Sequence, residues 1–102
     1  MPKYKVVFTD TAESDLDDIV VYLSNFSRNI ALKYYDEIMA KANSLVSMPE
    51  RCPFVNDRAL RAAGYRWLAV HNYIIFYYVN NISNKVHIRR ILYSGRDYTA
   101  IL

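Results

Sequence analysis

Side chains that could act as nucleophiles or general bases are few in this chain. Cys52 is the single cysteine, and a cysteine thiol acts as a nucleophile only when a neighbouring base activates it. The sequence places no such base near Cys52, which favours an inert thiol. A single cysteine also excludes an intramolecular disulfide, and with only two histidines no Cys/His cluster has metal-ligand spacing. We therefore expect neither a structural zinc site nor any other metal.

The two histidines occupy different contexts. His71 precedes Asn72 between two apolar runs, where both residue types tolerate turn geometry, so a turn role is favoured over catalysis. His87 alternates with Val86 and Ile88 and should face away from them. An imidazole titrates near neutral pH, which suits a general base, but no acidic residue stands beside His87 in the sequence.

Carboxylates gather at the start of an expected helix. Acidic residues in a first turn oppose the positive end of the helix dipole, so we interpret this cluster as a solvated helix start without paired-carboxylate chemistry. The cluster comprises Glu13, Asp15, Asp17 and Asp18. Further along, Trp67 lies between Arg66 and Leu68, where it either stacks on a nucleotide base or, more commonly for its type, packs in a core or interface.

Composition predicts one folded domain over residues 1–102. The chain is 53% hydrophobic and has only two Gly and three Pro, which excludes a disordered or fibrous class. The opening MPKYKVVFTD lacks the apolar core of a signal peptide, and no apolar run approaches the roughly 20 residues needed to cross a bilayer. We expect a cytoplasmic protein with no membrane contact.

The charge is distributed unevenly between the two halves of the chain. Residues 1–50 carry five Lys/Arg against eight Asp/Glu, whereas residues 51–102 carry eight against two. The acidic first half and the basic second half either neutralise each other in space or leave the second half free to meet an anionic partner.

Apolar periodicity divides the chain into a helical front and a stranded back. Alternation over residues 3–9 predicts a strand. Helical spacing predicts one helix from Asp10 to Phe26, which begins with Asp10 and Glu13 as a capping box, and a second helix from Ile30 to Val46. The short linker between them forces an antiparallel hairpin. Residues 49–64 read as a loop with a helical turn at Arg58 to Ala62.

The remaining apolar runs predict an antiparallel meander of three strands. Their sequences are YRWLAV, YIIFYYV and KVHIRRIL, joined by short polar turns. The middle run, residues 73–79, is apolar throughout and should be the central strand, covered on both faces. The helical hairpin can cover one face, while a loop, the C-terminal tail or a partner must cover the other. The fold class is therefore α+β, with the pairing of the first strand left open.

These elements resemble the RelE/ParE superfamily of toxins from type II toxin-antitoxin systems. The resemblance rests on the strand and acidic helix at the start, on ALKYYDEIMAKANSLVSMPE, GYRWLAVHNYIIFYYV and VHIRRILYSGRDY, and on the order in which they occur. It implies an N-terminal strand and a helical hairpin packed on a small antiparallel sheet. It also implies a cognate antitoxin partner, whose flexible segment folds onto the hairpin or the sheet, and no cofactor.

One class within this superfamily cleaves ribosome-bound mRNA without a metal. Such cleavage needs a base, an acid and cations at the phosphate. The two second-strand lysines of this class match Tyr65 and Trp67 here, and an arginine of the third strand matches Ile74, so three expected cations are missing. As a metal-independent endoribonuclease the chain would depend on Arg66, Arg96 and Tyr98.

The other class, the ParE-like toxins, poisons DNA gyrase by binding it and needs no catalytic residue. The motifs Y-x-I-F-Y and I-x-R-I-L-x-x-x-R-D bring the chain closer to this class. We therefore expect a growth-arresting toxin of a plasmid-stabilisation system that is not an enzyme; the alternatives are the mRNA endoribonuclease and an inactive antitoxin-binding module. Arginine and tyrosine are typical interface anchors, and the expected target-binding residues are Arg89, Arg90, Tyr93, Arg96 and Tyr98.

Two of these anchors have structural alternatives. Arg89 and Arg90 could instead form a solvated strand end or a salt bridge to the acidic helix. Tyr98 could instead pack the tail against the domain, since a tyrosine ring buries readily.

Overall fold

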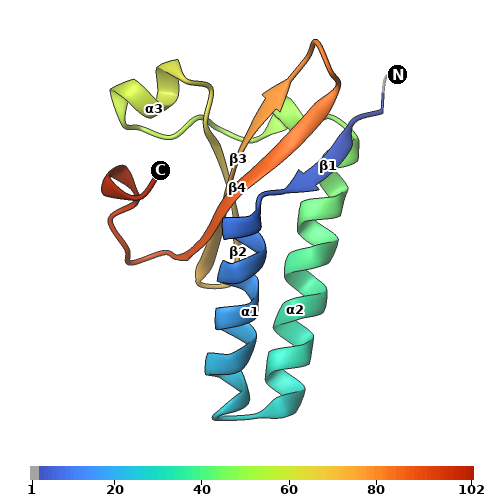
Figure 1. Ribbon diagram of the computed structural model, residues 1–102, viewed down its shortest axis with the longest axis vertical. Coiled ribbons are helices and arrows are strands. Elements are labelled where there is room, and N and C mark those ends of the chain that lie inside the picture. Colours follow the sequence, from blue (N-terminus) through green and yellow to red (C-terminus); the bar gives the residue numbers. More distant parts are fainter. Residues whose placement is uncertain (1–2) are drawn as a thin grey trace.

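A computed structural model describes residues 3–102 as a helical hairpin packed on one face of a four-stranded sheet (Figure 1). This arrangement confirms the α+β class. The order along the chain is β1 (Lys5–Phe8), α1 (Asp10–Ser24), α2 (Arg28–Asn43), α3 (Arg58–Ala62), β2 (Arg66–Val70), β3 (Tyr73–Asn80) and β4 (Lys85–Tyr93). Single 3-10 turns follow α2 at Ser44–Val46 and Pro49–Arg51, and one lies near the C-terminus at Tyr98–Ala100.

The sheet has the strand order β1-β4-β3-β2 and is mixed rather than wholly antiparallel. The last three strands form the expected meander, whereas β1 pairs in parallel with β4, which settles the pairing of the first strand. The helical hairpin and the rest of the chain supply the long crossover that a parallel pair requires. Val6 lies opposite Val86 and Phe8 opposite Ile88, and all four pack under the hairpin. Burial of these side chains fixes the register.

Side-chain caps set the helix starts, and the cap of α1 corrects the sequence prediction. Thr9, not Asp10, is the N-cap of α1: its Oγ1 accepts from the backbone N–H of Ala12 at 3.0 Å. The same hydroxyl donates to the carbonyl of Arg89 at 3.0 Å, so the cap also ties α1 to β4. Ser27 caps α2 in the same way, so α2 begins at Arg28, before the expected Ile30.

Both faces of β3 are covered, as predicted. One face packs under the hairpin and contributes Tyr73, Ile75 and Tyr77 to the larger core. The opposite face carries a smaller core of Val55, Phe76 and Leu92, covered by the loop before β2 and by the C-terminal tail; its partly buried neighbours include Leu60, Tyr98, Ile101 and Leu102. Each fully buried large apolar side chain contributes about 1.5–3 kcal/mol of burial free energy. We call the face of the sheet under the helical hairpin the hairpin face, and the opposite face the tail face.

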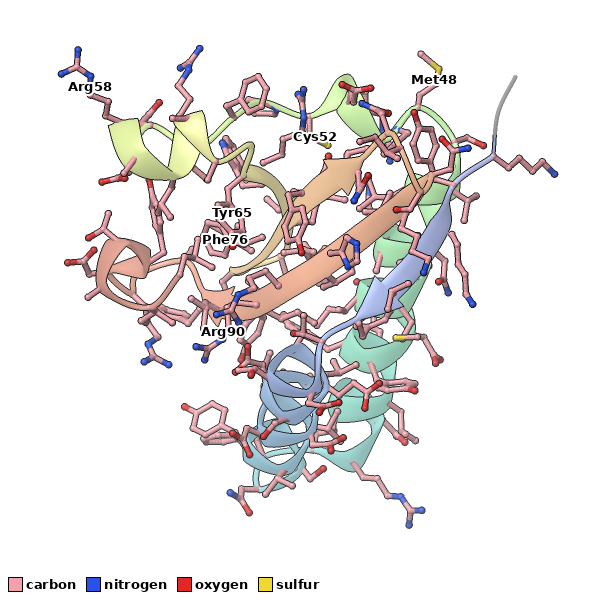
Figure 2. All side chains as sticks on the ribbon, turned by 45° about the horizontal axis from the view of Figure 1, so that its top comes forward. Met48, Cys52, Arg58, Tyr65, Phe76 and Arg90 are labelled. Atoms are coloured by element: carbon pink, nitrogen blue, oxygen red, sulfur yellow. The ribbon has the colours of Figure 1, made fainter. Side chains whose placement is uncertain are left out.

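The loop before β2 contains the predicted helical turn and a buried thiol. Asp57 caps α3 by accepting from the backbone N–H of Leu60 at 3.0 Å. Cys52 is free and buried, beside Tyr77, whose hydroxyl donates to the carbonyl of Pro49 at 2.6 Å. Burial, above all, raises the pKa of Tyr77. The hydrogen bond from Tyr77 to Pro49 thus ties the loop to the hairpin face of the sheet. Figure 2 shows Cys52 beneath the ribbon of this loop.

Candidate functional site

A groove of about 520 Å³ runs between α1 and the C-terminal end of β4. One wall comes from residues of α1 spaced three and four apart, which share one helix face: Asp15, Asp18, Ile19 and Tyr22. The opposite wall and the floor come from α2, the β2–β3 turn, the start of β3, the end of β4 and the segment after it: Tyr34, Asn72, Tyr73, Ile91, Leu92, Tyr93 and Arg96. We call this the α1 groove. It is rich in tyrosine and carries charge of both signs.

Asp15, which lines the α1 groove, forms an ion pair with Arg90. The Nε of Arg90 donates to Oδ2 of Asp15 at 2.8 Å, and Nη2 donates to Oδ1 at 2.9 Å. Only 17% and 12% of the two side chains are exposed. The hydrogen bonds to Asp15 are the main cause that raises the pKa of Arg90. The predicted alternative, a salt bridge to the acidic helix, is confirmed for Arg90, and the expectation that Asp15 is solvated is wrong.

Tyr93 and Arg96, two of the predicted anchors, both line the α1 groove. The backbone N–H of Arg96 donates to the carbonyl of Tyr93 at 3.0 Å, closing a turn around Gly95. The ring of Tyr93 is 51% exposed and packs edge-on against Tyr73, whose pKa is raised mainly by burial. Tyr93 and Arg96 thus line the same groove, together with the buried Tyr73.

Arg66 has a structural environment on the hairpin face. Its Nη1 donates to the carbonyl of Cys52 at 2.6 Å and to that of Glu50 at 3.0 Å. Its guanidinium carbon lies 3.8 Å from the ring centroid of Phe54, and its side chain is 12% exposed. Arg66 therefore fastens the loop to β2 through Nη1, and its Nη2 lies 3.7 Å from the carboxylate of Glu50.

Tyr98 lies on the tail face instead. Its ring packs on Phe76 with centroids 5.0 Å apart, beside a cavity of about 180 Å³ that Trp67 also lines. Just before it, Asp97 caps the turn, and its hydrogen bonds to Thr99 lower its pKa. The tail packing considered for Tyr98 is thus present.

The three residues proposed for RNA cleavage are consequently not brought together. Arg66 points to the hairpin face and Tyr98 packs on the tail face, while Arg96 lines the α1 groove. Arg89, the remaining predicted anchor, lies at a bulge in β4: Phe76 pairs with Arg90 and Tyr77 pairs with Ile88, which leaves Arg89 as the extra residue. Figure 2 shows Arg90 near the start of α1 and Phe76 on the side of α3 and the tail.

The histidines are held by aromatic stacking. His71 has a φ of 55° in the β2–β3 turn, as its turn role requires; it stacks on Tyr34 at 4.5 Å and contacts the carboxylate of Glu37. His87 stacks on Tyr78 at 4.8 Å. Within residues 3–102, no three His, Cys, Asp or Glu side chains are grouped closely enough to hold a metal ion. Over the same residues, the helices are too short or too polar to span a membrane.

The α1 wall of the groove is not among the sites that the sequence predicts. The acidic cluster that contains Asp18 is predicted as a solvated helix start, and no predicted site includes Tyr22. Their spacing with Asp15 gave the available signal, because residues three, four and seven apart share one face of a helix. The contribution of Tyr34 depends on how the two helices pack, which no local pattern reports.

Comparisons with known proteins agree with this architecture. The family described as the ParE toxin of the type II toxin-antitoxin system parDE matches residues 6–98. No curated protein matches the chain. Among solved structures, the chromosomal ParDE toxin-antitoxin system from P. aeruginosa contains a chain with 20% identity and a TM-score of 0.72, covering 91% of this chain and 98% of that one.

A second solved structure, the toxin-antitoxin complex RelBE2 from Mycobacterium tuberculosis, also contains a similar chain. It has 20% identity and a TM-score of 0.65, with 89% of this chain and 98% of that one covered. At this level of identity both structures support the shared fold. The family match spans nearly all of the residues that build the hairpin, the sheet and the groove, and the chain therefore belongs to the ParE toxin family of type II toxin-antitoxin systems.

Proposed function

We propose that this toxin arrests growth in the cytoplasm by binding DNA gyrase, within a plasmid-stabilising toxin-antitoxin pair. The observation that carries the proposal is the separation of Arg66, Arg96 and Tyr98 onto different surfaces. Metal-free RNA cleavage needs acid, base and cationic groups around one phosphate. Binding needs only anchors on an accessible surface, which this chain offers.

Tyr93 and Arg96 are the anchors of the proposed target contact. Interfaces draw most of their binding energy from a few Tyr, Trp and Arg side chains at a desolvated centre. Both residues line the α1 groove, where the ring of Tyr93 packs edge-on against the buried ring of Tyr73. Arg90 supports them indirectly, since its ion pair with Asp15 fixes α1 against β4.

The cognate antitoxin is proposed to neutralise the toxin by filling the α1 groove. Aromatic side chains at the end of α1 and in the turn after it extend the groove toward the end of the hairpin: Tyr22 is 57% exposed and packs on Phe26, which is 72% exposed. A flexible antitoxin segment that folds along α1 would bury these rings and cover Tyr93 and Arg96. The gyrase contact and the antitoxin contact then both use the α1 groove.

Two assays performed side by side test the target. The purified toxin is added to gyrase supercoiling reactions and to ribosomes carrying mRNA. We expect loss of supercoiling without new mRNA ends. New mRNA ends would contradict the proposal in favour of the endoribonuclease, and no effect in either assay would favour the inactive antitoxin-binding module.

Variants locate the contact. Arg96→Ala removes a groove anchor and should weaken gyrase inhibition by about tenfold or more, as hot-spot truncations do. Arg28→Ala, at an exposed position on α2, removes the same charge outside the groove and is the matched control. Thermal midpoints of both variants should stay near that of the wild type, and equal losses of inhibition in the two variants would contradict the assignment.

A further inference from the structure

Aromatic rings form a row across the tail face of the sheet. Tyr78 and His87 are cross-strand partners on β3 and β4, and their rings stack with centroids 4.8 Å apart and planes 16° from parallel. The ring of Tyr65 meets Tyr78 edge-on, at 5.5 Å and 82°. Val86 and Ile88 flank His87 in sequence and are buried under the hairpin, so alternation directs His87 to the opposite face. Figure 2 shows Tyr65 on that face, near α3.

The row ends in a step at the β1 edge of the sheet. Val7 lies directly opposite His87 in the parallel pair of β1 and β4. A valine side chain is shorter than a histidine side chain, so the face of the His87 ring that points away from Tyr78 extends above Val7. Within residues 3–102, Tyr78 is the ring that stacks on His87. Val7 is the floor of this step and His87 is its wall, backed by Tyr78. A flat aromatic group fits against such a wall.

Cations flank the step on both sides. Lys5 and Lys85 are partners in the register of β1 and β4, both are exposed, and both share the face of Val7 and His87. Arg89 follows His87 by two residues at the β4 bulge. Within residues 3–102 the ion pairs involve other side chains, so these three cations have no acidic partner there.

Such an arrangement is unfavourable for the isolated domain. Two like charges directly opposite each other on neighbouring strands repel, whereas a lysine opposite an acidic residue would stabilise the strand pair. An anion seated between Lys5 and Lys85 offsets the repulsion. The ligand that suits the step therefore combines negative charge with a flat ring.

We propose that the Val7–His87 step binds single-stranded nucleic acid. One base stacks on the outer face of the His87 ring, and phosphates on either side contact Lys5 with Lys85 and Arg89. Base stacking on protein rings combined with a cationic path for the backbone is the common mode of single-strand binding. A duplex keeps its bases stacked inside and cannot use the wall. This site is distinct from the α1 groove, and its test does not depend on gyrase.

Fluorescence anisotropy of a labelled oligothymidylate with the full chain tests the site, with an oligouridylate and a duplex of equal length in parallel. Binding of either single strand in preference to the duplex supports the proposal, and the preference between the two distinguishes DNA from RNA. Polyglutamate is the competitor. If it displaces the oligonucleotide as well as unlabelled single strand does, the site recognises charge alone, and the proposal fails.

Four substitutions separate stacking from charge. His87→Ala should weaken oligonucleotide binding by about fivefold or more with little change in its salt dependence, because it removes the stacking ring. Lys85→Gln and Arg89→Gln should each weaken binding and lower the slope of log affinity against log salt by about one. Lys41→Gln on α2 is the charge-matched control. Absence of single-strand binding by the wild type, or an equal loss with Lys41→Gln, overturns the proposal.

Discussion

Arg90 and Asp15 form a two-point ion pair that links β4 to the first helix, with N···O distances of 2.8 and 2.9 Å. The carboxylate also accepts the backbone N–H of Ile91 at 3.0 Å. A bidentate arginine contact fixes orientation as well as distance. The contact therefore determines how closely α1 approaches the sheet, and with it the width of the α1 groove.

Asp15→Asn should destabilise the fold by about 2–4 kcal/mol, because it leaves the mostly buried Arg90 guanidinium without its counter-charge. Urea unfolding at neutral pH measures the loss. Asp18→Asn is the matched control, since Asp18 forms none of the ion pairs within residues 3–102. A change below about 0.5 kcal/mol for Asp15→Asn, the range of ordinary surface substitutions, would mean that the pair contributes little.

Arg66→Ala should destabilise the chain by about 2–3 kcal/mol, since two carbonyls of the loop lose a charged donor and Phe54 loses its cation. Arg66→Lys should restore only part of this, because a lysine cannot reproduce the planar fork. Toxic activity per folded molecule should be unchanged. Loss of activity at wild-type stability would instead identify Arg66 as part of a catalytic centre.

The two glycines should respond differently to alanine. Gly64 has a φ of 90° after α3, so Gly64→Ala should cost about 1–2 kcal/mol through backbone strain alone, because a Cβ there meets no neighbouring atom. At Gly95, a Cβ would lie 2.8 Å from the Tyr93 ring. We expect Gly95→Ala to leave the melting midpoint nearly constant but to turn the Tyr93 ring and weaken target binding. An unchanged melting midpoint for Gly64→Ala, together with a lowered midpoint and unchanged target binding for Gly95→Ala, would contradict these roles.

Tyr77→Phe should change the alkaline limit of stability. Because burial raises the pKa of Tyr77, its proton stays on in the folded state while the unfolded tyrosine ionises near pH 10. Its contribution is therefore complete below pH 10 and is lost as the pH rises further. At pH 8 the variant should be about 1 kcal/mol less stable, for want of the bond to Pro49.

By pH 11 the gap between the wild type and Tyr77→Phe should close. Ionisation of the unfolded wild-type phenol at one pH unit above its ordinary pKa is worth about 1.4 kcal/mol, and the variant lacks that phenol. Urea midpoints from pH 8 to pH 11 measure the difference. A constant gap over this range would show that the Tyr77 hydroxyl titrates freely.

The sequence predicted the elements better than the contacts between them. Period and turn chemistry located the hairpin, α3 and the three-stranded meander, because each is encoded within a few neighbouring residues. The cap of α1 was assigned one residue late, since Thr9 and Asp10 both have capping side chains and only the approach of β4 selects Thr9. Charge alone suggested a salt bridge from Arg89 or Arg90 to the acidic helix, but local patterns could not single out Arg90 and Asp15, which are 75 positions apart.

The predicted site residues show the same difference between what local sequence encodes and what tertiary packing decides. Tyr93 and Arg96 lie close in sequence and were found together. Arg66 and Tyr98 looked equally available in the sequence, yet tertiary packing placed the first under a loop and the second on Phe76. Whether an arginine is free or already bound depends on distant carbonyls, which carry no side-chain signature.

The pairing of β1 with β4 joins the first strand of the chain to the last. A nascent chain can form the helical hairpin early, but its first strand has no partner until residues 85–93 have left the ribosome. Ile91, Leu92 and Tyr93 of that late strand also line the α1 groove. The α1 groove is therefore completed only after residues 85–93 have been synthesised, later than the helical hairpin that supplies its other wall.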